Sequence, residues 1–345
     1  MILPFNGRRI LLIGGAGFIG HHLALELQKR GAHVDVIDGL QVNNLVTFTA
    51  NVDKVPNRDL YLLHLNQRMR LLQEANVPVH VQDARDYAAL SHLLNVLQPD
   101  VIVMLAAVSH AGRANKNPYN TFDHSMRTLE NALDCARANV EHFVFFSSSM
   151  VYGNFHDVAV AEDSVCEPLG IYGALKYGGE KLVIAYNQVF DMPYTIIRPS
   201  ALYGERCVSR RVVQVFAENA LMGLPLRING DGNDALDFTY IRDLVQGVVR
   251  VLENTAARNE IFNITYGGAR SINQLVDGIR ERVPSVPVEH QPADALMPER
   301  GTLSVEKARS MLGYEPEFPL EDALHGYLDW YEAVFQERPD LLMGG

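Results

Sequence analysis

A tyrosine and a lysine four residues apart, Tyr172 and Lys176, form the pair in this chain best suited to move a proton. On a helix, this spacing places both side chains on one face. A nearby ammonium group favours the phenolate, so it lowers a phenol pKa that is normally about 10 toward the range where the oxygen can act as a general base. Many helices carry such a pair by chance, so a second observation is needed.

Three consecutive serines supply that observation. Ser147, Ser148 and Ser149 follow an apolar strand, and Ser148 stands 24 residues before Tyr172. Hydroxyls at the end of such a strand lie at the carboxyl edge of a parallel sheet, where α/β proteins bind their cofactors. The serines could instead only cap the strand. With the glycine loop described next, they indicate a proton-relay site beside a nicotinamide ring.

Three glycines, Gly14, Gly17 and Gly20, give the pattern G-x-x-G-x-x-G where a strand should turn into a helix. Glycine permits a tight turn and close approach to a pyrophosphate, and the helix N-terminus adds unpaired N–H groups and a positive dipole. Asp38 ends the next apolar strand, 24 residues after Gly14, where a carboxylate would accept hydrogen bonds from an adenine ribose. The spacing predicts dinucleotide binding, and the carboxylate favours NAD over NADP because it repels a 2′-phosphate.

A further carboxylate, Asp83, follows the third apolar strand. It could hold the adenine amino group, or it could cap the helix that should begin near Tyr87. The sequence leaves both interpretations open.

Short apolar strands alternate with amphipathic helices through the first half of the chain, which is typical of a parallel sheet covered on both faces. The chain is therefore predicted to form a Rossmann-type, doubly wound parallel sheet of the α/β class. The expected strands are 9–13, 33–37, 77–81, 101–105 and 142–147, and the expected helices are 17–30, 87–97 and 121–138. A long insertion at 41–76, with a helix expected over 61–74, has no role that the sequence assigns.

Beyond residue 200 the alternation weakens into helices at 209–222, 241–254, 272–282 and 320–335, separated by short strands and turns. This pattern predicts a smaller mixed α/β lobe at the C-terminal end. We expect residues 1–200 to form the NAD-binding domain that carries Tyr172 and Lys176, and residues 201–345 to form the substrate-binding lobe. Because no long linker separates them, the two should be interleaved.

The 345-residue chain has an ordinary globular composition, with 48% hydrophobic residues and a formal net charge of −11. This charge argues against nucleic acid or an anionic membrane surface as a partner. Arg8 and Arg9 before an apolar run imitate a signal peptide, but no small-residue cleavage site follows. No apolar run approaches the ~18 residues of a membrane span. Three cysteines without C-x-x-C spacing suggest neither a disulfide framework nor a metal site, so we expect a cytoplasmic protein.

The motifs as a set resemble the extended short-chain dehydrogenases/reductases of the NAD-dependent sugar epimerase/dehydratase family, and the match runs nearly end to end. They are specific for the family and much less specific for the substrate. The motifs are Gly14 to Gly20, Asp38, Leu105-Ala106-Ala107, Phe146 to Gly153, Tyr172 to Lys176, Arg198 to Gly204, Asp231-Gly232, Asp237 to Ile241 and Leu312-Gly313-Tyr314.

The resemblance implies that Tyr172 removes a proton from a sugar hydroxyl while hydride passes to NAD. Lys176 would bind the nicotinamide ribose and lower the tyrosine pKa. Ser148, four residues before Tyr152 of the Val-Tyr-Gly element, would be the hydroxyl partner, with Ser147 or Ser149 as alternatives. Tyr172 and Lys176 would also contact NAD, together with Gly14, Gly17, Phe18, Ile19, Gly20, Asp38, Asp83, Ala84, Leu105, Ala106, Ala107 and Pro199.

On the substrate side, the resemblance implies contacts from Ser109, His110, Ser149 and Met150, although His110 could equally be a solvated loop residue. Two diphosphate contacts common in the family are absent, because their positions hold Ala201 and Leu236, and His124 stands near an expected asparagine. Other cations must then hold the diphosphate, and the candidates are Arg206, Arg210, Arg211 and Arg300.

The reasons for expecting a diphosphate contact differ among these four arginines. Arg300 matches a family position that often grips a diphosphate. Arg210 and Arg211 open a predicted helix, where basic side chains are unfavourable unless an anion lies there. A solvated basic turn is the alternative for these two.

Dehydratase relatives carry Asp-Glu after the catalytic hydroxyl, and decarboxylase relatives carry Glu before the Val-Tyr-Gly element, where this chain has Ser149 and Met150. A thioether cannot carry a proton, so both chemistries lose their acid. We therefore expect an NAD-dependent nucleotide-sugar epimerase, acting at C4 through oxidation to a keto-sugar and return of the hydride. The alternatives are an NAD-dependent keto-sugar reductase or sugar dehydrogenase, a 4,6-dehydratase, and a non-catalytic NAD-binding scaffold.

The helices at 121–138 and 172–190 carry apolar positions beyond those that the sheet should need, namely Leu129, Leu133, Leu182 and Tyr186. The resemblance implies that such helices pair into a four-helix homodimer interface. Burial under the smaller lobe is the alternative.

Overall fold

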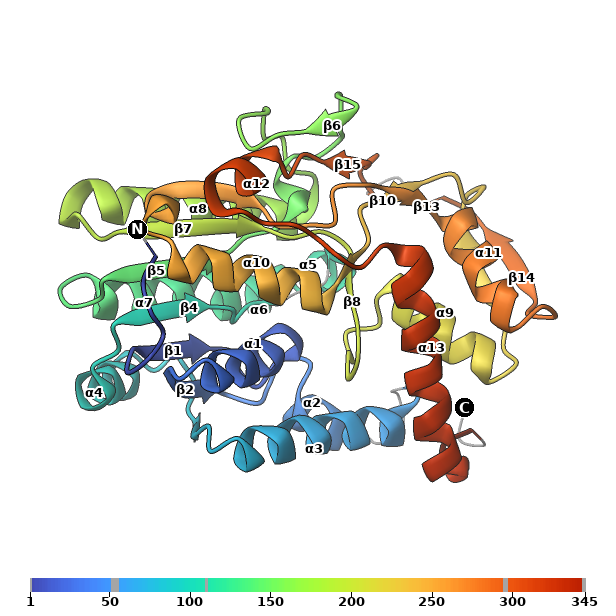
Figure 1. Cartoon of the computed structure of the whole chain (residues 1–345), viewed down its shortest axis with the longest axis horizontal. Helices are drawn as coiled ribbons and strands as arrows, with labels where there is room; N and C mark the ends of the chain where they lie inside the picture. The colour runs from blue at the N-terminus through green and yellow to red at the C-terminus, as the bar shows by residue number, and fades with distance from the viewer. Residues whose placement is uncertain (1, 51–55, 109–110, 294–296, 343–345) are drawn as a thin grey trace.

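The computed structural model describes residues 2–50, 56–108, 111–293 and 297–342, and its centre is a seven-stranded parallel sheet (Figure 1). The strand order is β12-β7-β5-β4-β1-β2-β3. The chain order reverses beside β1, which pairs with both β2 and β4, so this is the topological switch point of the sheet. The bounds are β1 Arg9–Ile13, β2 His33–Asp38, β3 Val79–Val81, β4 Val101–Met104, β5 His142–Phe146, β7 Tyr194–Arg198 and β12 Glu260–Asn263. The predicted Rossmann-type fold is confirmed.

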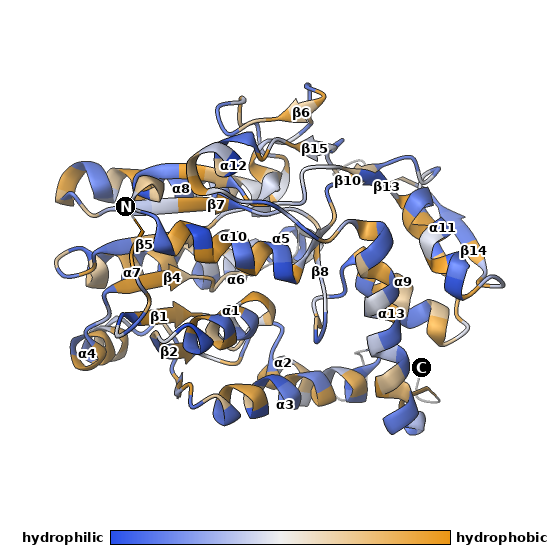
Figure 2. Ribbon diagram, viewed as in Figure 1, coloured by the Kyte–Doolittle hydropathy of each residue, from blue (hydrophilic) through white to orange (hydrophobic). Residues whose placement is uncertain are grey.

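The strands are apolar because helices cover both faces of the sheet. Every residue of β4 and β5 is buried, and Figure 2 shows β1 and β4 as hydrophobic. The expected strand at 101–105 ends one residue early, at Met104. The N–H groups of Leu105 and Ala106 both donate to the Ile13 carbonyl at 2.9 Å, so the chain turns out of the sheet at the switch point.

Two separate hydrophobic cores form, one on each face. Helices α1 (Phe18–Lys29) and α10 (Ile241–Glu253) lie side by side over one face, and their leucines meet Leu12 (Figure 1). Helices α4 (Tyr87–Leu97), α7 (Thr128–Ala136) and α8 (Gly170–Phe190) cover the other face and meet Leu11. Adjacent strand residues point to opposite faces, so Leu11 and Leu12 belong to different cores.

The second half of the chain builds a smaller lobe and also returns to the sheet. The lobe contains α9 (Val212–Leu221), α11 (Ile272–Arg282) and α13 (Leu320–Glu337), the parallel pair β9 (Leu226–Asn229) and β14 (Val288–Gln291), and the antiparallel pair β10 (Ala235–Leu236) and β13 (Arg270–Ser271). In the sequence, α10 and β12 lie between these elements. α10 packs on one face of the sheet, and β12 is one of its strands. The two halves of the chain are therefore interwoven in space.

Several short elements complete the chain. The expected helix at 121–138 is divided into α6, a turn of π-helix and α7. The short elements are α5 Ala111–Lys116, α6 Pro118–Phe122, the π-turn Asp123–Arg127, α12 Glu306–Leu312, the parallel pairs β6 Ala159–Val160 with β15 Thr302–Leu303 and β8 Leu202–Tyr203 with β11 Thr239–Tyr240, and the 3₁₀ turns Ser149–Val151, Thr255–Ala257 and Pro339–Leu342. Within the described ranges, no helix is long and apolar enough to cross a membrane.

The insertion between β2 and β3 folds into α2 (Leu45–Ala50) and α3 (Arg58–Glu74), and α3 runs toward α13 of the smaller lobe (Figure 1). A buried carboxylate on α9, Glu218, joins the two parts. It accepts hydrogen bonds from the Tyr61 and Tyr331 hydroxyls, each at 2.8 Å, and from Gln214 at 2.8 Å. Burying a carboxylate is costly unless such donors surround it, so this contact fixes α3 against the lobe.

Candidate active site

A cleft opens at the switch point, where the carboxyl ends of β1, β2 and β4 meet. Eleven of the fourteen residues expected to contact NAD line it together, whereas Tyr172, Lys176 and Pro199 are not among the lining residues. The eleven are Gly14, Gly17, Phe18, Ile19, Gly20, Asp38, Asp83, Ala84, Leu105, Ala106 and Ala107. These residues belong to four separate segments of the sequence, and the fold brings them together in one groove.

The glycine loop has the close packing that its spacing predicts. Gly14 has a φ of +83°, and a Cβ on it would lie 2.6 Å from the Ala106 nitrogen. A Cβ on Gly20 would lie 2.4 Å from the Gly15 Cα. The first turn of α1 therefore lies directly against the loop, with its unpaired N–H groups at the cleft.

Asp38, at the end of β2, is held in place by the same loop. Its carboxylate accepts a hydrogen bond from the Leu40 N–H at 2.8 Å and one from the Ala16 N–H at 3.1 Å. Burial raises the pKa of this carboxyl, which the two N–H donors oppose. A fixed carboxylate beside a glycine loop and a helix N-terminus fits the ribose and pyrophosphate of NAD.

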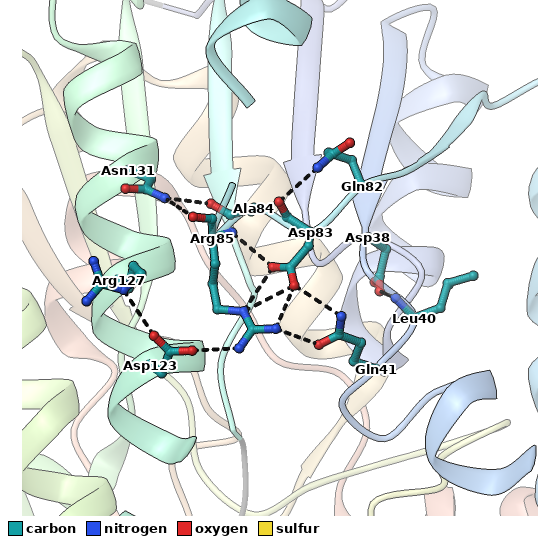
Figure 3. A network of polar contacts seen from close by, with 10 residues as sticks. All are labelled: Asp38, Leu40, Gln41, Gln82, Asp83, Ala84, Arg85, Asp123, Arg127 and Asn131. Atoms are coloured by element: carbon teal, nitrogen blue, oxygen red, sulfur yellow. Dashed lines mark hydrogen bonds and ion pairs between the residues drawn. The ribbon is translucent and has the colours of Figure 1, made fainter. Parts of the chain in front are cut away.

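Asp83 lies at the centre of a polar network at one end of the cleft (Figure 3). Arg85 donates from Nε to Oδ1 at 3.0 Å and from Nη2 to Oδ2 at 2.6 Å, and Gln41 donates to the same Oδ2 at 3.1 Å. The Arg85 guanidinium lowers the pKa of Asp83 to about 2. Arg85 also donates to Asp123 at 2.6 Å, which connects the cleft to the π-turn.

The interpretation of Asp83 as a helix cap is wrong. The residue that caps α4 is Asp86, whose carboxylate accepts a hydrogen bond from the Ala89 N–H at 3.0 Å. Asp83 stands three residues earlier, too far from the first turn to reach it, and its carboxylate faces Arg85 instead.

Tyr172, in the first turn of α8, meets the strand-end serines. Burial raises the pKa of the Tyr172 phenol, and the nearby Arg211 and Ser148 oppose that rise. The Ser147 hydroxyl donates instead to Glu180, and Ser149 is buried with its N–H on the Pro199 carbonyl at 2.9 Å. Of the three serines, the geometry therefore favours Ser148 as the partner of Tyr172.

A glycine makes this contact possible. Gly173 lies between Tyr172 and the next turn of α8, and a Cβ on it would lie 2.7 Å from the Met150 carbonyl oxygen. Only glycine lets α8 approach the 3₁₀ turn at 149–151 so closely. The sequence contains Gly173 inside the Tyr-x-x-x-Lys element, but its spacing gave no sign of this role.

Lys176 lies one turn along α8 and is buried. Its Nζ donates to the Phe146 carbonyl at 2.6 Å and lies 5.1 Å from the centre of the Phe145 ring. Burial lowers the lysine pKa to about 8, and Glu180 opposes the shift. This hydrogen bond holds the ammonium against the end of β5.

Burial raises the pKa of Tyr172, and the groups that lower it are Arg211 and Ser148. The sequence led us to expect that Lys176 would lower it. The difference has a physical reason, because the Lys176 ammonium is turned toward the Phe146 carbonyl and the buried phenol loses its solvation.

A buried ion pair supports the serine segment from behind. Arg198 donates to both oxygens of Glu180, at 2.9 Å and 2.7 Å, and Glu180 accepts from Ser147. The Arg198 guanidinium also donates to the Tyr152 hydroxyl at 2.9 Å. These bonds join β5, β7 and α8, so they fix the position of Ser148 relative to Tyr172.

Arg211 and Arg300 lie close enough for their charges to interact, and Arg211 also lines the cofactor cleft. Like-charge repulsion from Arg211 contributes to the lowered pKa of Arg300, and the same Arg211 charge acts on Tyr172. Burial is the larger effect on Arg300 and brings its pKa to about 10. The Nε atoms of both arginines are buried without a hydrogen-bond partner among the described residues. Two half-buried cations, each with a buried and unused Nε donor, are suited to bind an anion.

The other two candidate arginines lie elsewhere. Arg206 donates from Nε to the His21 ring at 3.0 Å, and Arg210 donates to the Tyr61 hydroxyl at 2.9 Å, facing α3. Neither is brought to Tyr172. Met150 and Ser149 are buried in the 3₁₀ turn, whereas Ser109 and His110 lie outside the described residues.

Some residues of the cleft were not expected from the sequence. Arg68 of the insertion, Ser209, His124 and Thr128 line the same groove as the glycine loop. Arg68 lies on a helix whose polar positions are mostly exposed, so no pattern distinguished it.

A Rossmann-type sheet whose switch point carries a glycine loop and a fixed carboxylate, together with a Tyr-x-x-x-Lys helix, is typical of NAD-dependent enzymes. Residues 10–265 match the family described as the NAD dependent epimerase/dehydratase family, and the chain belongs to it. Its cofactor is NAD.

Relatives cover almost the whole chain. The "Uncharacterized UDP-glucose epimerase YtcB" of Bacillus subtilis is 30% identical over 335 residues, which span 95% of this chain and 99% of that protein. UDP-glucuronate 4-epimerase 1 of Arabidopsis thaliana is 30% identical, over 96% of this chain and 78% of that protein. The solved structure of UDP-glucuronic acid 4-epimerase from Bacillus cereus with UDP-glucuronic acid and NAD has a TM-score of 0.83 at 26% identity, over 94% of this chain and 99% of that chain.

Proposed function

We propose that this protein is an NAD-dependent nucleotide-sugar epimerase that inverts C4 of the sugar. The observation that carries the proposal is that Tyr172 lies near Ser148 and Arg211, and that Arg211 and Arg300 interact through their charges and each have a buried Nε without a partner among the described residues. This arrangement places the proton-transfer pair near the two arginines that we propose to bind the diphosphate. Relatives named as UDP-glucose and UDP-glucuronate 4-epimerases support the choice of C4.

The proton transfer falls to Tyr172 and Ser148. Bound NAD supplies a reversible hydride acceptor next to them. The Tyr172 oxygen removes the proton of the sugar 4-hydroxyl, and Ser148 donates to the phenolate and stabilises it. Arg211 favours the phenolate by its charge. The same phenol returns the proton after the keto-sugar has turned its other face to the cofactor.

The diphosphate is held by Arg211 and Arg300. Arg211 is the N-cap residue of α9, so the unpaired N–H groups of that helix face the same region. Anchoring the substrate by its diphosphate leaves the sugar free to rotate, which an epimerase needs and a one-way oxidoreductase does not.

A dehydratase is not supported, because no carboxyl group follows Ser148. Ser149 and Met150 occupy those positions, and both are buried in the 3₁₀ turn. Elimination of water requires an acid to protonate the leaving hydroxyl, and neither side chain can supply one.

Proton NMR of the purified protein with a panel of UDP-, GDP-, CDP- and dTDP-sugars, without added NAD, tests the proposal. The expected result is conversion of one sugar to its 4-epimer by the wild type and loss of at least about 100-fold in rate in Tyr172→Phe. A net change in absorbance at 340 nm with substrate, without an epimer, would instead identify an oxidoreductase that releases its cofactor.

We also propose a homodimer formed through the outer faces of α7 and α8. Leu129 and Leu133 are buried against the central sheet and not under the smaller lobe, so they do not reach a partner. Leu182 and Tyr186 are partly exposed, and Val189 and Phe190 continue the apolar stripe along α8. Sedimentation should give twice the chain mass of 38.5 kDa, and a mass equal to that of one chain would refute the dimer.

The cytoplasm is the proposed compartment, because Cys135, Cys166 and Cys207 are all free thiols. The proposed substrate, a nucleotide-diphosphate sugar, carries the negative charge that Arg211 and Arg300 would neutralise.

A further inference from the structure

The insertion at 41–76 contributes a buried arginine to the cofactor cleft. Arg68, on α3, is 1% exposed and lines the same groove as Gly14, Gly17 and Asp38. Its Nε donates to the Arg206 carbonyl at 3.1 Å, and its Nη2 donates to the same oxygen. The guanidinium has five N–H donors, so this one carbonyl leaves part of the fork available on the side of the cleft.

Arg68 has no carboxylate ion pair among the described residues. Burial lowers its pKa to about 10, Arg206 lowers it further, and Asp38 and Cys207 oppose the shift only through space. A charge in this position is costly to bury unless an anion neutralises it. Since the side chain lines a cleft that binds a dinucleotide, the ligand is the natural source of that anion.

The position of Arg68 is tied to the glycine loop by a chain of hydrogen bonds. The Arg206 residue that accepts from Arg68 donates through its own Nε to His21 Nε2 at 3.0 Å. The other ring nitrogen of His21 lies 2.9 Å from the Gly17 carbonyl. Burial lowers the pKa of His21 well below its usual value, which keeps the ring neutral and able to accept at Nε2 and donate at Nδ1. These hydrogen bonds therefore fix the position of α3 relative to the glycine loop.

We propose that Arg68 binds the pyrophosphate of NAD, so that the insertion supplies a cation to the cofactor site opposite the first turn of α1. The N–H groups of α1 and the Arg68 guanidinium would then neutralise the two phosphates from two sides. Asp38 and Arg68 line the same groove, so we expect the arginine to reach the end of the pyrophosphate that is nearer to the adenine ribose. The inference concerns the cofactor alone and does not depend on the sugar substrate.

The experiment compares Arg68→Met with Arg70→Met. Arg70 lies two residues further along α3, is 67% exposed and pairs with Glu74 at 3.5 Å, so it is a matched control outside the cleft. Holoprotein loaded with NADH is mixed with excess NAD, and the loss of bound-NADH fluorescence gives the dissociation rate. We expect Arg68→Met to release NADH 10- to 100-fold faster and Arg70→Met to match the wild type.

A second measurement separates a phosphate contact from a general weakening of the cleft. Bound NADH is displaced by ADP or by adenosine, and the concentrations for half displacement are compared. The proposal requires Arg68→Met to weaken ADP at least tenfold while adenosine changes less than threefold. Equal weakening of both, or an unchanged NADH rate, would overturn it. A selective loss of NADP affinity with unchanged NAD affinity would overturn it as well, in favour of a 2′-phosphate contact.

Circular dichroism and thermal unfolding show whether each variant is folded. If Arg68→Met does not fold, Arg68→Lys is measured in the same way. A single ammonium cannot both satisfy the Arg206 carbonyl and reach the phosphates, so the ratio of ADP to adenosine affinity should fall at least threefold. An unchanged ratio in a folded Arg68→Lys protein would contradict the proposal.

Discussion

At the scale of single residues, burial sets the charge of the proton-transfer groups. The lost solvation raises the pKa of Tyr172 and lowers that of Lys176 to about 8. A base that works near neutral pH must therefore gain its phenolate from nearby cations and donors. Ser148 and Arg211 provide this effect within the chain, so Arg211 has two roles, as an anion ligand and as a charge that acts on the base.

The double role of Arg211 leads to a prediction. Arg211→Met should raise KM for the nucleotide sugar 10- to 100-fold, the usual cost of about 1.5–3 kcal/mol for a lost hydrogen bond to a charged group. Removing the cation also disfavours the phenolate, so the acidic limb of the kcat profile should move to higher pH. Steady-state kinetics across pH measure both effects.

Arg210→Met is the matched control for this variant. Arg210 stands next in sequence but donates to Tyr61 in the contact between α3 and the smaller lobe. Its loss should reduce the free energy of unfolding and leave KM and the pH profile unchanged. A shift of KM in Arg210→Met equal to that in Arg211→Met would show that the basic turn acts only through its total charge.

At the scale of elements, the active site depends on how closely α8 approaches the end of β5. Tyr172 and Lys176 belong to α8, Ser148 follows β5, and Gly173 lies where the two segments touch. The Glu180–Arg198 pair holds the same junction from the same face of the helix, one turn beyond Lys176 and two turns beyond Tyr172. Proton transfer is sensitive to such distances, because the reacting groups must lie within hydrogen-bond reach.

Gly173→Ala should therefore reduce activity without unfolding the protein. The added methyl group would lie 2.7 Å from the Met150 carbonyl, so α8 must move away and Tyr172 must separate from Ser148. A displacement of this kind can cost roughly 100-fold in kcat. Gly178→Ala, on the same helix, meets nothing within 4 Å and should keep full activity while raising the free energy of unfolding by up to about 1 kcal/mol. Equal activity of the two variants would contradict the role of the close contact.

The sequence predicted those elements whose signals are local. Alternating apolar strands and helices predicted the sheet, and the glycine spacing with Asp38 predicted which strand ends carry the cofactor cleft, because parallel strands align their carboxyl ends. The helix cap considered at Asp83 was wrong, because Asp86 accepts the first-turn hydrogen bond of α4 and no local pattern distinguished two carboxylates three residues apart. The π-turn at 123–127 inside the expected helix left no trace in the apolar periodicity.

Contacts between distant segments could not be predicted. Arg210 and Arg211 are neighbours in sequence, yet one faces Tyr61 and the other acts on Tyr172. Arg210 has a φ of +55°, and this left-handed turn sends the two side chains apart. Arg68 reaches the cleft only because Glu218 fixes α3 against the lobe, and no local pattern encodes a contact over that separation.

At the scale of the whole molecule, buried histidines and buried aspartates have opposite effects on the free energy of unfolding as the pH falls. Burial lowers the pKa of His142 and His22 to about 3, and it raises the pKa of Asp237 and Asp243 to about 6. The stabilising contribution of the neutral histidines is lost as the pH falls below about 6.5. The aspartates instead add to the free energy of unfolding as they take up protons below about pH 6. The wild-type curve is therefore the sum of opposite slopes, and single variants are needed to separate them.

His142 gives the clearest test of this balance. It is buried at the start of β5, and its Nε2 lies 2.8 Å from the Thr195 hydroxyl, which itself donates to the Ala257 carbonyl. Nε2 must therefore carry the hydrogen of a neutral ring. The folded pKa lies below the unfolded value, so the stabilising effect is complete above about pH 6.5 and is lost, by about 1.4 kcal/mol per unit, as the pH falls toward 3.

His142→Gln keeps a donor for Thr195 and cannot be protonated. Urea unfolding should therefore show that lowering the pH from 7.5 to 5 costs wild type about 2 kcal/mol more than His142→Gln. His33→Gln, which replaces an exposed side chain at the start of β2, should follow the wild type at both pH values. If the two variants lose stability in parallel, the acid sensitivity does not come from the buried imidazole.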